Sequence, residues 1–494
     1  MSFQARHISA VPSHSVNPDA KATQFNSNAK DASKVVCTLR KTQCVYANEP
    51  LSSPNALTSP SAAIDVRRTS STSPTTLQVT VGANTFDPFD SYPPTSLPRA
   101  RVQNLIGHFL SKIAFQYYPL DLDPTSNPFI NSWWPLALAD PALFNVSLQT
   151  ASLDVELHAQ KGFHQSAILM HDAVSLIRHK IDDPTLAFQD ATLDAVVTLA
   201  AIEHGKGNIH ECKMHIDAVK RMVAVRGGLS EVKRSSPLTA RMVPWVSLLV
   251  TGSPQFEVQD DYGNGNGIAP IDQWQLAPRS ENHNIDLEDS PKFGGLNPNL
   301  EDVFVRLRNI LNPAAGDESP KQLSTNDLHD LTCFVLHKLL SPSLTELDAI
   351  SECVRHATAI YMFVIHGPTY YSHAAILHQI TFKLQTHLEE LTPSHKTNSS
   401  LHIWCVSVGM LAATGTGQQE WFISQGSTIA RTLGMETWEG VKSCLQDIFA
   451  LDVRSEVMFR KVWEPILASS PASTGPTDAR ALYSPFDNTE GTDD

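Results

Sequence analysis

Residues 401–467 read LHIWCVSVGMLAATGTGQQEWFISQGSTIARTLGMETWEGVKSCLQDIFALDVRSEVMFRKVWEPIL, and this pattern is the strongest indication of how the chain folds. Four of the eight tryptophans lie here: Trp404, Trp421, Trp438 and Trp463. Apolar residues recur at helical spacing, and short Gly- and Thr-containing turns separate the apolar runs. The stretch therefore predicts consecutive helices that pack around buried tryptophans, and it contains no catalytic motif.

The same helical periodicity extends through most of the chain from Arg99 onward. Apolar residues between Val102 and Ile113 predict a first helix that runs to about Tyr118. Asp140 suits the N-cap of the next helix and Pro141 suits its first turn. Further helices are predicted at about 160–181, 187–206, 209–227 and 238–251, from about 300, and at about 324–341, 344–366, 371–390, 400–414, 417–433, 437–450 and 453–467. Strand signals are scarce, so the predicted fold class is all-α.

Composition divides the chain into five regions. Residues 1–98 are rich in Ser, Thr and Pro and lack periodicity, which predicts disorder. A first helical half is predicted at 99–251 and a second at 299–467. Between them, residues 252–298 carry 2 basic and 8 acidic side chains, a charge of -6, and are predicted to form an acidic loop. Residues 468–494 are predicted to be a disordered tail.

The charge distribution limits where the chain can contact nucleic acid. The 494 residues carry a net charge of -14. Residues 1–100 hold 9 Lys or Arg and 6 Asp or Glu, a charge of +3, so the remaining residues carry -17. Because an acidic surface is repelled by phosphate, direct DNA contact is expected only from the first hundred residues or from a partner.

The seven cysteines are dispersed and odd in number, which favours reduced thiols in the cytosol or nucleus over a disulfide framework. The N-terminus shows no apolar run typical of a signal peptide. No segment approaches about 18 consecutive apolar residues, so no membrane span is expected.

A second informative stretch is ECKMHIDAVKRMVAVRGGL at residues 211–229. Ile216, Val219 and Met222 form part of an apolar stripe on one helix face. The pair Gly227 and Gly228 is suited to end that helix, because glycine adopts the left-handed backbone conformation at little cost. The pattern predicts a packed helix with a glycine cap, and no chemistry.

Three motifs together resemble the fungal-specific transcription factor domain, over roughly residues 100–467. The first is H-x-x-G/A-x-x-x-M-x-x-x-R-G-G, and it is matched by His215, Ala218, Met222, Arg226, Gly227 and Gly228. The second is a "LPLA-x-x-D-P-x-L" stretch, matched by Trp134, Pro135, Leu136, Asp140, Pro141 and Leu143. The third is the tryptophan-rich end, with its "LGM-x-x-WE" and "R-x-x-WE" segments. The resemblance implies a large multi-helix regulatory domain.

The N-terminus departs from the family pattern. There, a binuclear zinc cluster C-x2-C-x6-C…C-x2-C-x6-C usually precedes the helical domain and contacts DNA. This chain has only Cys37 and Cys44, separated by six residues, and Lys34 stands where another cysteine would be. Two ligands do not build a structural zinc site. The cluster has decayed, an exon is missing from the gene model, or the match is accidental. No metal site is predicted.

The resemblance implies a fungal transcriptional regulator in the nucleus, of metabolic or secondary-metabolite genes. It implies no enzyme and no cofactor. Other transcription regulators or a second copy are the expected partners, with DNA contact indirect and no membrane association. An alternative is an interaction scaffold that kept the fold and does not bind DNA.

A more remote alternative is a helical enzyme such as a terpene cyclase. Two aspartate pairs, Asp182 with Asp183 and Asp260 with Asp261, resemble its magnesium-binding carboxylates. The extended aspartate motif and the second metal-binding site that such an enzyme needs are both missing from the sequence. Solvated loop carboxylates are therefore the preferred interpretation.

Overall fold

A computed structural model of the chain describes residues 92–117, 125–160, 162–277, 296–312, 323–342, 347–391 and 400–469. These residues form seventeen α-helices, two short helical turns and one isolated β-bridge, between Val258 and Ile268. The predicted all-α class is confirmed. The cysteines of the zinc-cluster hypothesis, Cys37 and Cys44, lie outside the described residues.

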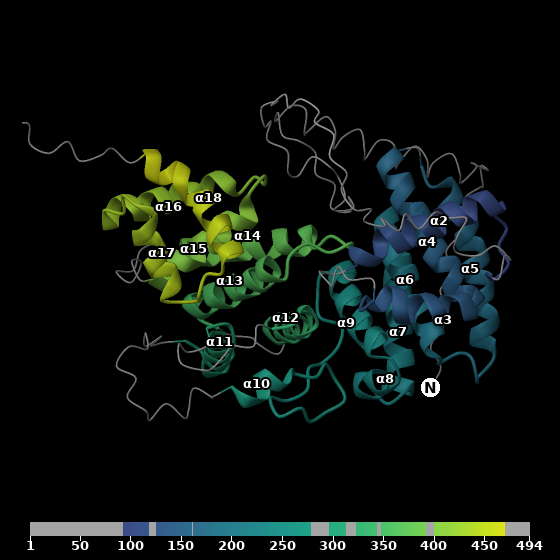
Figure 1. Cartoon of the computed structure of the whole chain (residues 1–494). Helices are drawn as coiled ribbons and strands as arrows, with labels where there is room; N and C mark the ends of the chain where they lie inside the picture. The colour runs from purple at the N-terminus through teal and green to yellow at the C-terminus, as the bar shows by residue number, and fades with distance from the viewer. Residues whose placement is uncertain are drawn as a thin grey trace, which may run out of the picture. The chain divides into compact units, whose positions relative to one another are not determined.

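The helices up to residue 251 include two that are buried on nearly every side. Residues 142–154 of α4 and 191–203 of α6 are buried without interruption. A helix that is buried on all sides must lie inside a packed domain, and Figure 1 shows α4 and α6 among α2, α5 and α7. The elements are α2 (Arg99–Ser111), η2 (Ile113–Phe115), η3 (Phe129–Trp133), α3 (Trp134–Ala139), α4 (Pro141–Ala159), α5 (His164–Asp182), α6 (Asp190–Lys206), α7 (Ile209–Val225), α8 (Leu229–Ser235) and α9 (Pro237–Thr251).

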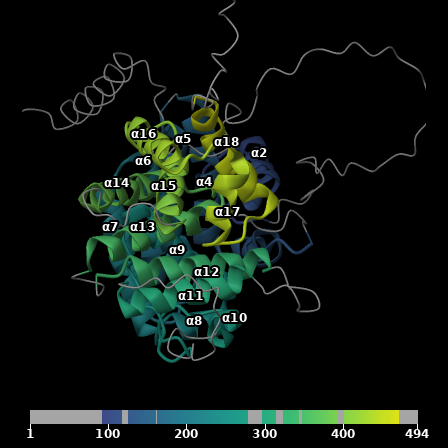
Figure 2. The ribbon, with the colours of Figure 1, turned by 90° about the vertical axis from the view of Figure 1, so that its left-hand side faces the viewer.

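The later helices are arranged around α13 and α15. Helix α15 contacts α13, α14, α16, α17 and α18, and Figure 2 shows it beside these neighbours. The elements are α10 (Asp272–Leu276), α11 (Pro298–Leu311), α12 (Thr325–Leu339), α13 (Ala349–His366), α14 (Ala374–Leu391), α15 (Ser400–Ala413), α16 (Gln419–Leu433), α17 (Trp438–Gln446) and α18 (Val453–Ser469).

Polar and aromatic contacts join the earlier helices to the later ones. The hydroxyls of Tyr117 and Tyr371 lie 2.8 Å apart. Arg241 on α9 donates to both carboxylate oxygens of Asp330 on α12, at 2.8 and 3.0 Å. A bidentate guanidinium–carboxylate pair fixes orientation as well as distance, so α9 and α12 are held in one register.

The first helix ends earlier than predicted. The sequence predicts a helix to about Tyr118, but α2 ends at Ser111 and a single 3₁₀ turn follows. The Ser111 hydroxyl donates to the Gly107 carbonyl at 2.6 Å, and Asn127 donates to the Ala114 carbonyl at 2.9 Å. These side chains satisfy carbonyls at the frayed end, a tertiary effect that apolar spacing does not reveal.

None of the helices in the described ranges is both long and apolar enough to cross a lipid bilayer.

Candidate functional site

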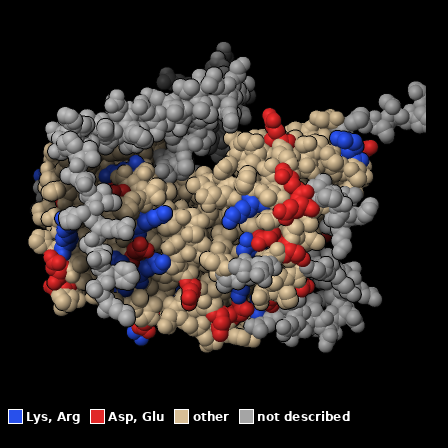
Figure 3. All heavy atoms as spheres, turned by 180° about the vertical axis from the view of Figure 1, so that it is seen from behind, with Lys and Arg blue, Asp and Glu red and all other residues tan. Residues whose placement is uncertain are grey.

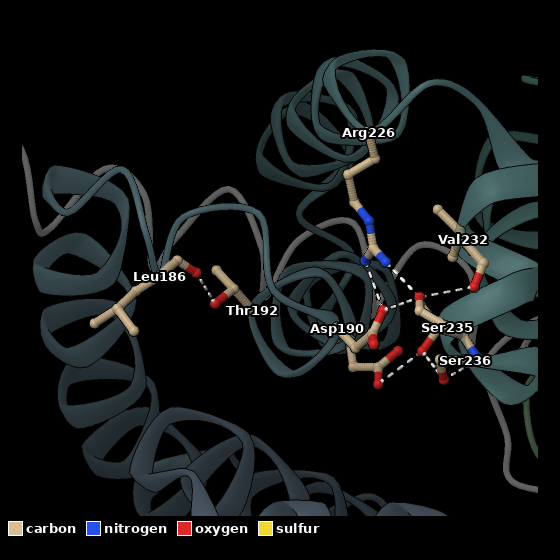
Figure 4. Close-up of polar contacts among 9 residues, drawn as sticks. Leu186, Asp190, Thr192, Arg226, Val232, Ser235 and Ser236 are labelled. Carbon is tan, nitrogen blue, oxygen red and sulfur yellow. Dashed lines mark hydrogen bonds and ion pairs between the residues drawn. The ribbon is translucent and has the colours of Figure 1, made fainter.

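The side chain of Arg226 joins three helices, and it follows directly after α7. Its Nη1 atom donates to Asp190 Oδ1 on the first residue of α6 at 2.6 Å, and its Nη2 donates to Ser235 Oγ at the end of α8 at 2.5 Å (Figure 4). Ser235 Oγ lies 3.2 Å from Asp190 Oδ1 and 3.1 Å from the Val232 carbonyl. The Arg226 and Asp190 side chains are only 14% and 26% exposed, so solvent screens this ion pair less than a surface pair.

The two glycines after Arg226 make the turn from α7 into α8. Gly227 has φ 92° and Gly228 has φ 103°, both in the region that favours glycine. A Cβ on Gly228 would lie 2.6 Å from the carbonyl oxygen of Asn266. The same carbonyl accepts the backbone N–H of Leu229 at 2.8 Å. Glycine is therefore required at position 228, because the backbone of the loop that contains Asn266 lies where a side chain would be.

A buried carboxyl group lies one turn along α6 from Asp190. Asp194 is 2% exposed, and its Oδ2 accepts the Thr239 hydroxyl of α9 at 3.0 Å. Thr239 in turn lies 2.7 Å from the hydroxyl of Ser236, the N-cap of α9. Burial raises the pKa of Asp194 to about 8, and the nearby Asp190 carboxylate adds to the rise. The Asp194 side chain is therefore mainly protonated at neutral pH.

The three family-motif residues on α7, His215, Ala218 and Met222, lie outside this network. Met222 is 7% exposed and belongs to the hydrophobic core. His215 is partly buried, and burial lowers the pKa of its imidazole. The motif thus combines packing positions on the helix with one polar tether, Arg226, and one tight turn.

The upstream motif builds the start of α4. Asp140 caps the helix, because its Oδ1 accepts the backbone N–H of Leu143 at 3.0 Å, as predicted. Its second oxygen pairs with Lys180 of α5. Trp134 is buried and its ring centroid lies 5.9 Å from that of Phe144. This segment therefore anchors α4 against α5 and α3.

Residues 104–250 match a family model described as the fungal specific transcription factor domain. This segment is similar to the fungal specific transcription factor domain. It runs from within α2 into α9 and contains both the Arg226 network and the α4 motif, so the predicted resemblance is confirmed there. The match points to a transcriptional regulator. No curated protein and no solved structure matches the chain.

The tryptophan-rich stretch lies beyond the matched residues, and two of its tryptophans are fully buried. Trp463 is 0% exposed, and its indole N–H donates to Ser407 Oγ on α15 at 2.9 Å. Trp404 packs against Phe304 and Phe449, with centroid distances of 5.8 and 5.4 Å. An aromatic cluster thus joins α11 to α15, and the Trp463 hydrogen bond joins α18 to α15.

The remaining two tryptophans lie nearer the surface. Trp438 is 7% exposed, and its indole N–H donates to Glu456 Oε1 of α18 at 3.3 Å. The same carboxylate accepts Lys442 Nζ at 2.9 Å. Trp421 is only partly buried and meets the ring of Phe422 edge-on at 4.8 Å. The four tryptophans therefore differ in how much stability each contributes.

The aspartates of the enzyme alternative are engaged in local structure. Asp261 accepts Lys338 Nζ at 2.7 Å and the indole N–H of Trp274 at 3.0 Å. Asp183 accepts the backbone N–H and the hydroxyl of Thr185 at 2.8 and 2.7 Å. Asp183 therefore serves the turn after α5, whereas Asp261 ties its loop to α10 and α12 and is partly buried, so the interpretation as solvated loop carboxylates does not hold for Asp261 or for Asp182, the last residue of α5.

A small cavity of about 140 Å³ lies beside the Gly228 turn, lined by α8, α9 and α12 residues that include Lys233, Arg241 and His329. Ligand pockets usually enclose about 300–1,000 Å³, so this space is small for a metabolite. A second cavity of about 560 Å³ is lined by charged residues such as Asp302 and by segment 254–258. Its Asp261 and Lys338 already pair with each other.

The surface charge is mixed on the face opposite to that of Figure 1. Lys and Arg side chains are interspersed with Asp and Glu there, without a continuous basic field (Figure 3). Phosphate binding relies on clustered cations, and the described residues visible on this face do not form such a cluster.

Sequence reasoning identified Arg226 and the glycines but missed the partners of Arg226 and the buried Asp194–Thr239 pair. Asp190, Ser235 and Thr239 come from three different elements, and their polar side chains carry no distinctive local pattern. A signal did exist for Asp194, which is the one charged residue in the apolar run LDAVVTLAAI at 193–202. An ionisable residue inside such a run predicts a buried, perturbed group.

Proposed function

We propose that this chain is a fungal transcriptional regulator of metabolic or secondary-metabolite genes, and that it acts in the nucleus through its helical domain. The observation that carries the proposal is the family match over residues 104–250. The matched residues coincide with helices α2 to α9, and the Arg226 network and the Gly228 turn hold α6, α7 and α8 together.

We further propose that DNA contact is indirect and is made through a second copy or another regulator. The charge of -17 beyond residue 100 opposes phosphate binding, and the first hundred residues carry only +3. Cys37 and Cys44 alone do not supply the six thiolates of a binuclear cluster. A partner with its own DNA-binding element removes both difficulties.

The test is chromatin immunoprecipitation of the tagged full-length chain, together with its cellular location. Discrete promoter peaks and a nuclear signal are expected. Arg226→Ala is expected to weaken the peaks, because it removes the hydrogen bonds that join α7 to α6 and α8. The matched control is Arg234→Ala, since that arginine is 79% exposed and, among the described residues, pairs with Glu231 on its own helix. Peaks should persist in the Cys37→Ser/Cys44→Ser double variant if contact is indirect.

A cytosolic chain without promoter peaks would overturn the proposal. The scaffold would then be the favoured function, and it predicts that stable protein partners co-purify with the chain from the cytosol. Peaks that vanish in the double cysteine variant would overturn indirect contact alone and would assign DNA binding to the N-terminal region.

A further inference from the structure

Helices α13 and α14 bring two imidazoles and one carboxylate together, away from the Arg226 network. Glu352 and His356 are one turn apart on α13, and His387 projects from the neighbouring α14. One oxygen or nitrogen atom of each side chain lies within 4.8 Å of those of the other two. The imidazole rings have centroids 5.6 Å apart and planes 11° apart.

Both imidazoles are oriented by partners that leave one nitrogen able to bind a cation. His356 Nδ1 lies 2.8 Å from the Glu352 carbonyl oxygen, which only accepts, so Nδ1 carries the proton and Nε2 keeps its lone pair. His387 Nδ1 lies 3.2 Å from Glu390 Oε2, which assigns the same tautomer. A carbonyl or carboxylate behind an imidazole is the usual outer partner of a metal-bound histidine.

Charged groups of both signs surround the three side chains, and Lys383 adds a positive charge near His356 to that of Arg355. The Arg355 guanidinium pairs with Glu352 Oε2 at 2.7 Å, and the other carboxylate oxygen is then available to a cation. Glu390 supplies a second negative charge beside His387. His356 is 1% exposed, so one ligand is held rigidly in the core while the His387 side chain is 25% exposed and can adjust.

We propose that Glu352, His356 and His387 form a zinc-binding site that clamps α13 to α14. Two imidazoles and a carboxylate are a ligand set that zinc accepts, with the fourth position open to water. Zinc bonds of about 2.0–2.1 Å place tetrahedral ligand atoms about 3.3 Å apart. The three side chains already lie close together, and a rotation of His387 can bring its free nitrogen toward the other two ligands.

The test is isothermal titration of zinc chloride into the full-length, chelator-treated chain. A Cys37→Ser/Cys44→Ser background removes the N-terminal thiol pair as a competing site. One zinc ion of micromolar or tighter affinity is expected, and His387→Ala should weaken it at least about tenfold. His378→Ala is the matched control, because this histidine is exposed on the same helix. Glu352→Gln should weaken binding similarly.

A second readout is thermal unfolding. Stoichiometric zinc should raise the midpoint of the parent chain and not that of His387→Ala, because an ion that binds only the folded state stabilises it. Magnesium should do neither, since it prefers oxygen ligands. Equal zinc affinity in the parent and in His387→Ala, or no zinc uptake by the parent at about 100 µM, would overturn the proposal.

Discussion

Replacing Asp194 with Asn should change how the stability of this protein depends on pH. The folded-state pKa of Asp194 is about 8, whereas the ordinary value is 3.8. Between these two values the folded state binds a proton that the unfolded state has released. The free energy of unfolding therefore falls as pH rises through this window, by about 1.4 kcal/mol per pH unit. Asn cannot ionise, so the variant lacks this contribution.

The assay is urea unfolding followed by tryptophan fluorescence at about pH 6 and about pH 7 and constant ionic strength. From pH 6 to pH 7, the free energy of unfolding of the parent should fall by about 1.4 kcal/mol more than that of Asp194→Asn. Buried histidines with lowered pKa values, such as His356 and His373, are common to both proteins and cancel in the difference. Asp217→Asn, at an exposed carboxylate on α7, is the control and should follow the parent.

If the free energy of unfolding changed equally with pH in the parent and in Asp194→Asn, the reasoning would be refuted. They would mean that the Asp194 carboxylate is already ionised in the folded protein at pH 6. The interior of α6 would then have to stabilise a negative charge that, among the described contacts, only the Thr239 hydroxyl faces directly.

Two further changes test the packing. Gly228→Ala should lower the free energy of unfolding, measured by thermal unfolding, by at least about 1–3 kcal/mol, because the added Cβ meets Asn266 at a residue with positive φ. Gly440→Ala is the control: it lies on an open helix face and should be neutral or stabilising. Equal effects of the two substitutions would contradict this account. Trp463→Ala should cost about 3–5 kcal/mol by denaturant titration, and Trp421→Ala only about 1 kcal/mol. The burial argument fails if Trp421 proves the costlier site.

Apolar spacing predicted most of the helices correctly. The predicted ranges 400–414 and 417–433 correspond closely to α15 and α16, because each helix must bury a stripe that recurs every three to four residues. Helices shorter than about two turns escaped prediction, and α8 and α10 are examples. Such segments carry too few apolar residues to show a period, and their neighbours hold them in place.

Local sequence was sufficient wherever a structural feature depends on one stretch of chain. The all-α class, the Asp140 cap and the glycine turn after Arg226 are of this kind, since helix propensity, capping and backbone freedom act over a few residues. The predicted division into two halves and the role of the first hundred residues stay predictions.

Partners distant in sequence became known only from the folded chain. Arg226 meets Asp190 from 36 residues away, and His356 stacks on His387 from a neighbouring helix. The raised pKa of Asp194 likewise depends on the helices that exclude water from it. Burial, charge pairing and ligand convergence arise when separate helices pack together, and no single segment encodes them.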